Sequence, residues 1–230
     1  MNLIEKNLSR LRASIKDAAE RSGRSADAVR LVAVTKTRSA EEINMAIRAG
    51  VADAGENRVQ ELLEKHEAVD QVRWHMIGHL QTNKVKYIID KVDLIHSVES
   101  LSLAQEIQKR AGQAGKQMDV LIQINPAMEE SKFGVTADEA EQLAREILHS
   151  FPNLKIKGLM SMAPFSDDAE EVRPYFREAR QLFDHFAEIS HPNMQAEILS
   201  MGMSNDYAVA IEEGSNLVRI GSALFGERNL

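Results

Sequence analysis

The sequence predicts a (β/α)8 barrel, the TIM-barrel class of α/β proteins, with one extra helix at the N-terminus. From residue 30 onward, short apolar runs alternate with segments of helical periodicity, a pattern typical of parallel strands joined by helical crossovers. There are eight such runs in 230 residues, and eight strands in ~250 residues are usual for this barrel. A doubly wound open sheet is the alternative. It is less favoured because no glycine-rich turn follows the first run.

The opening segment is expected to form an amphipathic helix over residues 3–21, because apolar residues recur there at helical spacing. The eight strands are expected over residues 31–35, 52–55, 73–77, 93–98, 120–125, 156–160, 196–200 and 217–220. The run at 52–55 is the weakest of these. The connecting helices are expected over residues 40–49, 58–66, 83–90, 101–114, 137–148, 168–189 and 205–213. No linker divides the chain, so we expect a single domain over residues 1–230.

Composition excludes several classes of function. The chain carries 28 Lys and Arg against 35 Asp and Glu, and its net charge of −7 disfavours nucleic-acid or anionic-membrane partners. The absence of cysteine excludes disulfides, thiolate catalysis and cysteine-ligated zinc. The N-terminus lacks the apolar core of a signal peptide, and no stretch approaches the ~20 apolar residues of a membrane span. We therefore expect a cytoplasmic protein.

Lys36 closes the first predicted strand, at the end of the barrel where functional residues gather. An amine at the edge of a core is partly desolvated, and its pKa can fall to roughly 7–8, low enough to attack a carbonyl. Taken alone, Lys36 is more simply a surface lysine whose stem lies along the strand end. The residues at the other strand ends must decide between these interpretations.

Small residues and hydroxyls follow the seventh and eighth strands, at Ser200–Ser204 and at Gly221-Ser222. Loops at these two positions commonly hold a phosphate in this barrel, with help from a helix N-terminus. The second loop is not a Walker motif, because Glu227 stands where that motif needs lysine. The glycines are also consistent with tight turns alone.

Arg219 lies within the otherwise apolar eighth strand. A buried guanidinium must be paired, since an unpaired buried charge costs several kcal/mol. Its partner is either an internal carboxylate, which is the commoner case, or an acceptor on a bound ligand. Lys36, a phosphate loop and Arg219 around one barrel mouth together describe a site for pyridoxal 5′-phosphate (PLP). In such a site the lysine forms a Schiff base and the arginine meets the ring nitrogen.

The other titratable residues give weaker indications of a functional role. His75 and His79 have the four-residue spacing of a zinc pair, but Gly78 separates strand from helix and no third ligand is evident. We therefore expect no metal site. Glu56 is interpreted as a helix-start carboxylate more readily than as a general base.

Six segments of the chain resemble the pyridoxal phosphate homeostasis proteins (the YggS/PROSC-like family). They are residues 31–37 (LVAVTKT), 55–61 (GENRVQE), 74–84 (WHMIGHLQTNK), 158–160 (GLM), 199–206 (LSMGMSND) and 218–226 (VRIGSALFG). The resemblance covers nearly the whole chain, with the motifs in order. It implies a fold type III barrel similar to the N-terminal domain of alanine racemase.

The resemblance also implies roles for particular residues. It places PLP on Lys36 and Arg219 opposite the pyridine nitrogen. It implies that the rest of the cofactor is held by Asn57, Ser200, Ser204, Gly221 and Ser222. Lys132 is implied to approach the ring hydroxyl. Ser222 and Arg58 replace the threonine and tyrosine of many members, and the first change keeps the hydroxyl.

An arginine at the ring nitrogen disfavours protonation of that nitrogen, so the bound ring would be a weak electron sink. Racemases of this fold also take a second base from a further domain, which the 230 residues leave no room to build. We therefore expect a monomeric protein without catalytic residues that buffers PLP or delivers it to PLP-dependent apoenzymes, a role in vitamin B6 homeostasis. The alternatives are a fold type III enzyme with weak amino-acid racemase or decarboxylase activity, and an aldolase-type lysine acting without a cofactor.

Overall fold

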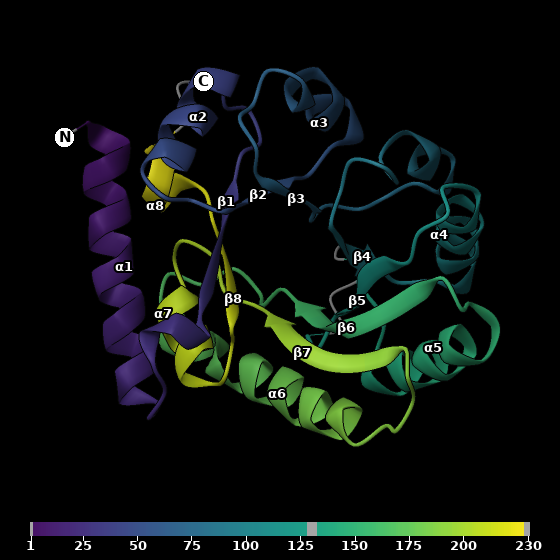
Figure 1. Ribbon diagram of the computed structural model, residues 1–230. Coiled ribbons are helices and arrows are strands. Elements are labelled where there is room, and N and C mark those ends of the chain that lie inside the picture. The colour runs from purple at the N-terminus through teal and green to yellow at the C-terminus, as the bar shows by residue number, and fades with distance from the viewer. Residues whose placement is uncertain (1, 128–132, 228–230) are drawn as a thin grey trace.

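A computed structural model describes residues 2–127 and 133–227. Its centre is a closed barrel of eight parallel strands arranged in sequence order, with β1 completing the circle against β8 (Figure 1). The strands are β1 (Arg30–Val34), β2 (Asp53–Glu56), β3 (Arg73–Met76), β4 (Leu94–Val98), β5 (Met118–Ile124), β6 (Leu154–Ser161), β7 (Met194–Ser200) and β8 (Leu217–Ile220). The predicted fold class is confirmed, and the short run at 52–55 does form a strand.

Helices surround the barrel, and α1 lies outside the ring against α7 and α8 (Figure 1). The α-helices are α1 (Leu3–Arg21), α2 (Ala40–Arg48), α3 (Val59–His66), α4 (Leu101–Gln113), α5 (Ala137–Ser150), α6 (Arg173–Ala187), α7 (Tyr207–Glu212) and α8 (Ser222–Phe225). The described residues also form three 3-10 helices: η1 (Ala26–Ala28), η2 (Thr82–Tyr87) and η3 (Ala169–Val172). Within the described ranges, no helix is both long and apolar enough to cross a bilayer.

Several elements differ from the sequence-based expectation, and the 3-10 helix η1 was not expected at all. The helix expected over residues 83–90 is the 3-10 helix η2, a form common in short connectors. The long helix expected over residues 168–189 is split into η3 and α6, because Pro174 favours the first turn of a new helix. Helix α8 was not expected, since a single turn has no periodicity to detect.

The apolar core lies mainly between the strands and the helices. One large cluster fills the space beneath α3 to α6, and a second packs α1, α2, α7 and α8 against β1 and β8. The buried residues Leu94, Leu121 and Met160 form a separate small cluster. Polar side chains accompany it inside the barrel, where His96 of β4 contacts Ser200 of β7 across the interior.

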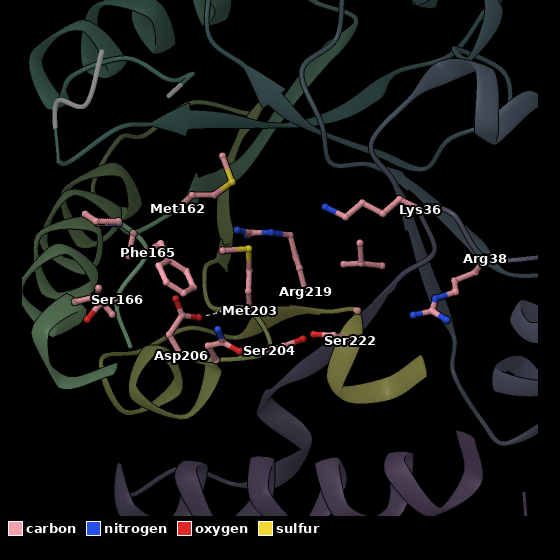
Figure 2. Close-up of a pocket in the computed structure, with 16 residues that line it drawn as sticks. Lys36, Arg38, Met162, Phe165, Ser166, Met203, Ser204, Asp206, Arg219 and Ser222 are labelled. Carbon is pink, nitrogen blue, oxygen red and sulfur yellow. Dashed lines mark hydrogen bonds between the residues drawn. The ribbon is translucent and has the colours of Figure 1, made fainter. Parts of the chain in front are cut away.

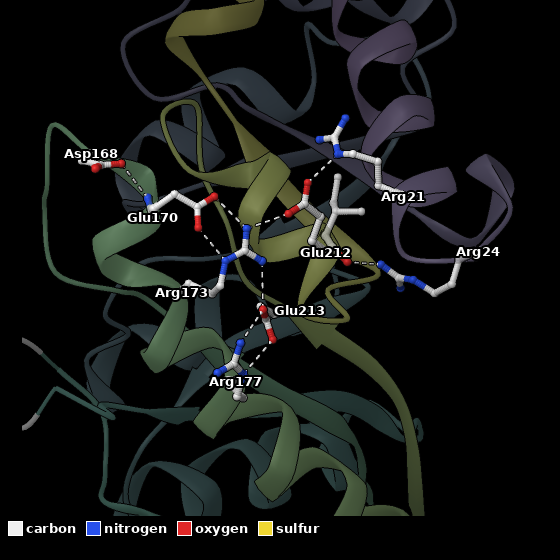
Figure 3. A network of polar contacts seen from close by, with 9 residues as sticks. Arg21, Arg24, Asp168, Glu170, Arg173, Arg177, Glu212 and Glu213 are labelled. Atoms are coloured by element: carbon white, nitrogen blue, oxygen red, sulfur yellow. Dashed lines mark hydrogen bonds and ion pairs between the residues drawn. The ribbon is translucent and has the colours of Figure 1, made fainter.

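Ion pairs anchor α7, the helix between the seventh and eighth strands (Figure 3). Arg173 at the start of α6 pairs with Glu170 and Glu212 at 2.7 Å and with Glu213 at 2.9 Å. Arg21 at the end of α1 also pairs with Glu212, at 2.7 Å. A network of this kind fixes geometry better than isolated surface pairs do. It ties α1 and α6 to the C-terminal end of α7.

We predict that Gly158→Ala destabilises the barrel. Gly158 lies in β6 at a register shift, has a φ of 136°, and a Cβ there would lie 2.0 Å from the carbonyl oxygen of Ile198. We expect the free energy of unfolding in urea to fall by about 3 kcal/mol or more. Gly115→Ala is the control, because its φ of 65° is also positive but its Cβ would meet nothing within 4 Å. Strain alone should cost roughly 1–2 kcal/mol there. Equal losses in the two variants would contradict the steric argument.

Candidate functional site

A cavity of about 360 Å³ opens at the carboxyl ends of β1, β6, β7 and β8 (Figure 2). This is the barrel end at which functional sites of the class lie, and the volume suits a small molecule. The cavity is lined by Val34, Lys36, Arg38, Met162, Ala163, Pro164, Phe165, Ser166, Val172, Met203, Ser204, Asn205, Asp206, Arg219, Gly221 and Ser222. Its rim is partly apolar, since Phe165 is 78% exposed.

Five of the seven predicted cofactor-binding residues meet at this cavity: Lys36, Ser204, Arg219, Gly221 and Ser222. The side chain of Lys36 extends into the cavity toward the guanidinium of Arg219, and Ser204 and Ser222 lie together on one side (Figure 2). Lys36 follows the first strand and Ser222 follows the last, so the two residues are far apart in the sequence. Closure of the barrel between β1 and β8 is what brings them together.

The other two predicted residues do not line the cavity. Ser200 is fully buried behind Arg219, whose Nη1 donates to its hydroxyl at 2.7 Å. Asn57 follows β2, and its buried Oδ1 has no hydrogen-bond partner among the described residues. Lys132 lies outside the described residues.

Arg219 is a buried cation held by oxygen atoms that carry no net charge. Its side chain is 3% exposed, Nη1 donates to the Ser200 carbonyl at 2.8 Å, and Nη2 donates to the Ser161 carbonyl at 2.9 Å. No ion pair found in residues 2–127 and 133–227 includes it, so the internal carboxylate considered as its partner is not seen there. Burial lowers the pKa of Arg219 to about 10, with the Asp206 carboxylate opposing the shift. The group remains a cation at neutral pH.

The backbone on both sides of Lys36 is tied to α3. Thr37 has a φ of 64°, which is unusual for a β-branched residue, and its N–H donates to Glu61 Oε2 at 2.7 Å. Before Lys36, the carbonyl of Thr35 accepts from Lys65 Nζ at 2.9 Å. These contacts hold an otherwise unfavourable turn from which the Lys36 side chain projects.

Glu56 and Lys65 form the buried centre of this attachment. Lys65 Nζ lies 2.7 Å from Glu56 Oε1 and 3.0 Å from Glu61 Oε2, so with Thr35 it has three acceptors for its three donors. Desolvation raises the pKa of Glu56, although its hydrogen bonds to Lys65 and Thr35 oppose the shift. Glu56 is the last residue of β2, and its carboxyl group holds the Lys65 amine and the Thr35 hydroxyl in place. Its interpretation as a helix-start carboxylate was wrong.

Lys65 was missed in the sequence, although a signal for it exists. The buried positions of α3 are Val59, Leu62 and Lys65, at three-residue intervals along one face. A lysine on that stripe must find a buried partner. Glu61, four residues earlier in the chain, is one such partner.

Backbone donors face the cavity where β8 ends. Among the described residues, the N–H groups of Gly221 and Ser222 donate no hydrogen bond, and the next N–H, of Ala223, donates to Ser204 Oγ at 3.3 Å. The loop after β7 needs glycine at position 202, because φ is 92° there and a Cβ would lie 2.6 Å from the Cβ of Ala210. Together the two loops offer N–H and hydroxyl groups to an anion.

The two histidines considered as zinc ligands point to different places. His75 is buried inside the barrel, whereas the ring of His79 is partly exposed, lies 2.8 Å from Glu99 and stacks on Phe133. In the part of the chain that the structure describes, no group of histidine and acidic residues could hold a metal ion.

Comparison with known proteins identifies relatives over the full chain. The family model for the alanine racemase N-terminal domain matches residues 6–229. A pyridoxal phosphate homeostasis protein of Aquifex aeolicus is 46% identical, with 99% of each chain covered. The PLP-bound structure of PipY from Synechococcus elongatus is 30% identical with a TM-score of 0.83, covering 97% of this chain and all of that one. A structure of an unknown protein from Bifidobacterium adolescentis is 35% identical with a TM-score of 0.88, covering 96% and 94%.

We predict that Lys65→Met lowers the free energy of unfolding by roughly 3–5 kcal/mol, because it leaves the Glu56 carboxylate buried without its cation. The folded-state pKa of Glu56 is already raised, so its contribution to stability is greatest at low pH and is lost as the pH rises through that pKa. Removing Lys65 raises that pKa further. The deficit measured by urea unfolding should therefore shrink on acidification.

Two controls accompany this variant. Lys65→Met combined with Glu56→Gln should recover most of the loss, because no buried charge remains unpaired. Lys16→Met removes an exposed ion pair with Glu20 and should change stability by no more than about 0.5 kcal/mol. A loss in Lys65→Met that is independent of pH and of Glu56 would refute the buried-pair explanation.

Proposed function

The chain belongs to the alanine racemase N-terminal domain family and, within it, to the pyridoxal phosphate homeostasis proteins, and we propose that it holds PLP as a Schiff base on Lys36 for buffering or delivery. Its role is cofactor binding in intracellular vitamin B6 homeostasis, without enzymatic turnover. The relatives bear that name, and PipY has PLP bound.

The cavity carries this proposal, because it offers a separate partner for each polar end of PLP. Lys36 supplies an amine for the aldehyde, and the N–H groups of Gly221 and Ser222 are available to the phosphate. Arg219 lines the same cavity, and no hydrogen bond from its Nε is found within the described residues. That donor can meet the ring nitrogen.

The remaining predicted residues have supporting roles in this proposal. Ser204 adds its hydroxyl to the phosphate loop, and Ser200 acts by orienting Arg219. The unpartnered Oδ1 of Asn57 is an acceptor for a polar ring substituent. We propose that residues 1–230 work as one PLP-binding domain and as a monomer in the cytoplasm, with PLP-dependent apoenzymes as recipients.

The chemistry of the site favours holding the cofactor over turnover. When bound, PLP supplies an aldehyde and a ring that withdraws electrons most strongly when its nitrogen is protonated. Arg219 remains a cation at neutral pH and has only donors, so it keeps that nitrogen in its acceptor form. Exposed Phe165 and Met203 at the rim leave the mouth accessible from solvent, which suits release of the cofactor.

We predict that the purified protein loaded with PLP absorbs visible light and that borohydride fixes the label on Lys36. Lys36→Ala should abolish the visible band, because no other lysine among the described residues lines the cavity, while urea unfolding shows a folded protein. Lys86→Ala, an exposed lysine in η2, is the matched control and should retain the band. A colourless wild-type protein, or label on another lysine, would refute the proposal.

We also predict that the loaded protein exchanges no α-proton of alanine or other amino acids with deuterated water, measured by proton NMR over hours. Exchange that is abolished by Lys36→Ala would instead support the alternative, a weak racemase or decarboxylase.

A further inference from the structure

Five buried side chains form a continuous hydrogen-bonded chain through the barrel. Arg219 Nη1 lies 2.7 Å from Ser200 Oγ, which lies 3.1 Å from His96 Nδ1. His96 Nε2 lies 2.9 Å from His75 Nδ1, and His75 Nε2 lies 3.0 Å from Asp53 Oδ1. The residues come from β8, β7, β4, β3 and β2, and none is more than 3% exposed.

The groups at the two ends of the hydrogen-bonded chain have fixed donor and acceptor roles. Arg219 can only donate. Asp53 can only accept, because despite desolvation its hydrogen bonds to His75 and Arg73 hold the pKa of its carboxyl well below the usual range. Arg73 binds it with both Nε and Nη2, each at 2.8 Å.

One arrangement of protons satisfies every link with neutral imidazoles. Ser200 accepts from Arg219 and donates to His96 Nδ1, His96 Nε2–H donates to His75, and His75 Nε2–H donates to Asp53. Burial lowers the pKa of His96 well below its usual value, and the Arg219 cation adds to the shift. A neutral His96 fits this arrangement.

We propose that Ser200, His96 and His75 are positioning residues that connect Arg219 to the carboxylate of Asp53 and so hold its guanidinium toward the ring nitrogen of PLP. The role toward PLP rests on the proposed function. The hydrogen bonds of Arg219 within the described residues go to neutral oxygen atoms, with Asp206 acting on it electrostatically, and the aligned dipoles of the hydrogen-bonded chain present their negative ends to the guanidinium. His75, which the sequence offered only as an unlikely zinc ligand, thus acquires a role.

The hydrogen-bonded chain also joins two cavities. Its far end, Asp53 with His75 and Arg73, lines a second cavity of about 430 Å³ at the amino ends of the strands. The other charged residues lining that cavity are Asp27, Arg30, Asp93, Asp119, Lys157 and Glu197. The hydrogen-bonded chain therefore links the cation at the cofactor mouth to the Asp53–Arg73 ion pair at the opposite end of the barrel.

The first test needs no cofactor. Nitrogen-15 NMR of histidine-labelled apoprotein at neutral pH should show His75 and His96 as neutral rings protonated at Nε2. His75→Gln and His96→Gln assign these two signals among the seven histidines. An Nδ1-protonated His96 or a doubly protonated His75 would overturn the proposed chain, whether or not the protein binds PLP.

The second test measures the dissociation constant and absorption maximum of bound PLP in His96 variants. His96→Asn retains an oxygen near the position of Nδ1 to accept from Ser200, whereas His96→Leu fills the space without an acceptor. We expect the dissociation constant to rise about tenfold in His96→Leu, with a shifted absorption maximum, and less than about threefold in His96→Asn. Loss of packing alone predicts the reverse order, because asparagine is the smaller side chain.

Ser97→Ala is the matched control, since Ser97 neighbours His96 in β4 and its hydroxyl has no partner among the described residues. It should bind PLP as the wild type does. His96→Leu with wild-type affinity and spectrum would overturn the positioning role. A wild-type protein that fails to bind PLP would overturn the proposed function instead, while the NMR result still decides whether the chain exists.

Discussion

The burial of Arg219 is the constraint on which the site depends. A guanidinium inside a barrel needs several fixed acceptors, because desolvation of an unpaired charge costs several kcal/mol. Carbonyl oxygens at the ends of β6 and β7 supply two of them, and the Ser200 hydroxyl supplies a third. Meeting this need makes the interior polar where apolar layers usually fill such barrels. The same atoms fix the direction of the remaining guanidinium donors.

On the Lys36 side of the cavity, the constraint is a strained backbone. Thr37 adopts a backbone conformation that costs about 1–3 kcal/mol, and the buried Glu56–Lys65 pair with Glu61 holds it there. A cation is thus buried on each side of the cavity. Arg219 is held by neutral acceptors on one side, and Lys65 is held by carboxylates on the other. Each arrangement restrains one of the two groups proposed to meet the cofactor, Arg219 and Lys36. A binding site needs rigid support of this kind, because its groups must be held in a productive geometry.

The strands, and the residues at their ends, could be predicted from sequence because their signals are local. Apolar runs and helical periodicity located all eight strands, and barrel closure then implied that Lys36 and Arg219 would share a mouth. The supporting contacts could not be predicted in the same way. His96 and Ser200 are 104 residues apart, and nothing near either one indicates the other. The depth of Ser200, behind Arg219 and away from the cavity, depends likewise on how side chains pack in three dimensions.

A barrel shared with alanine racemase does not by itself decide between holding PLP and turning over substrates, since function depends on the site and not on the fold. In this chain the deciding element is the state of the ring nitrogen. A carboxylate partner would favour its protonation, whereas a cation with no acceptor atoms excludes it. The hydrogen-bonded chain to Asp53 strengthens this choice, because it stabilises the protonated guanidinium from behind. In the proposed site, the interior that makes the burial of Arg219 tolerable therefore also keeps the bound ring a poor electron sink, so that the same residues serve both stability and function.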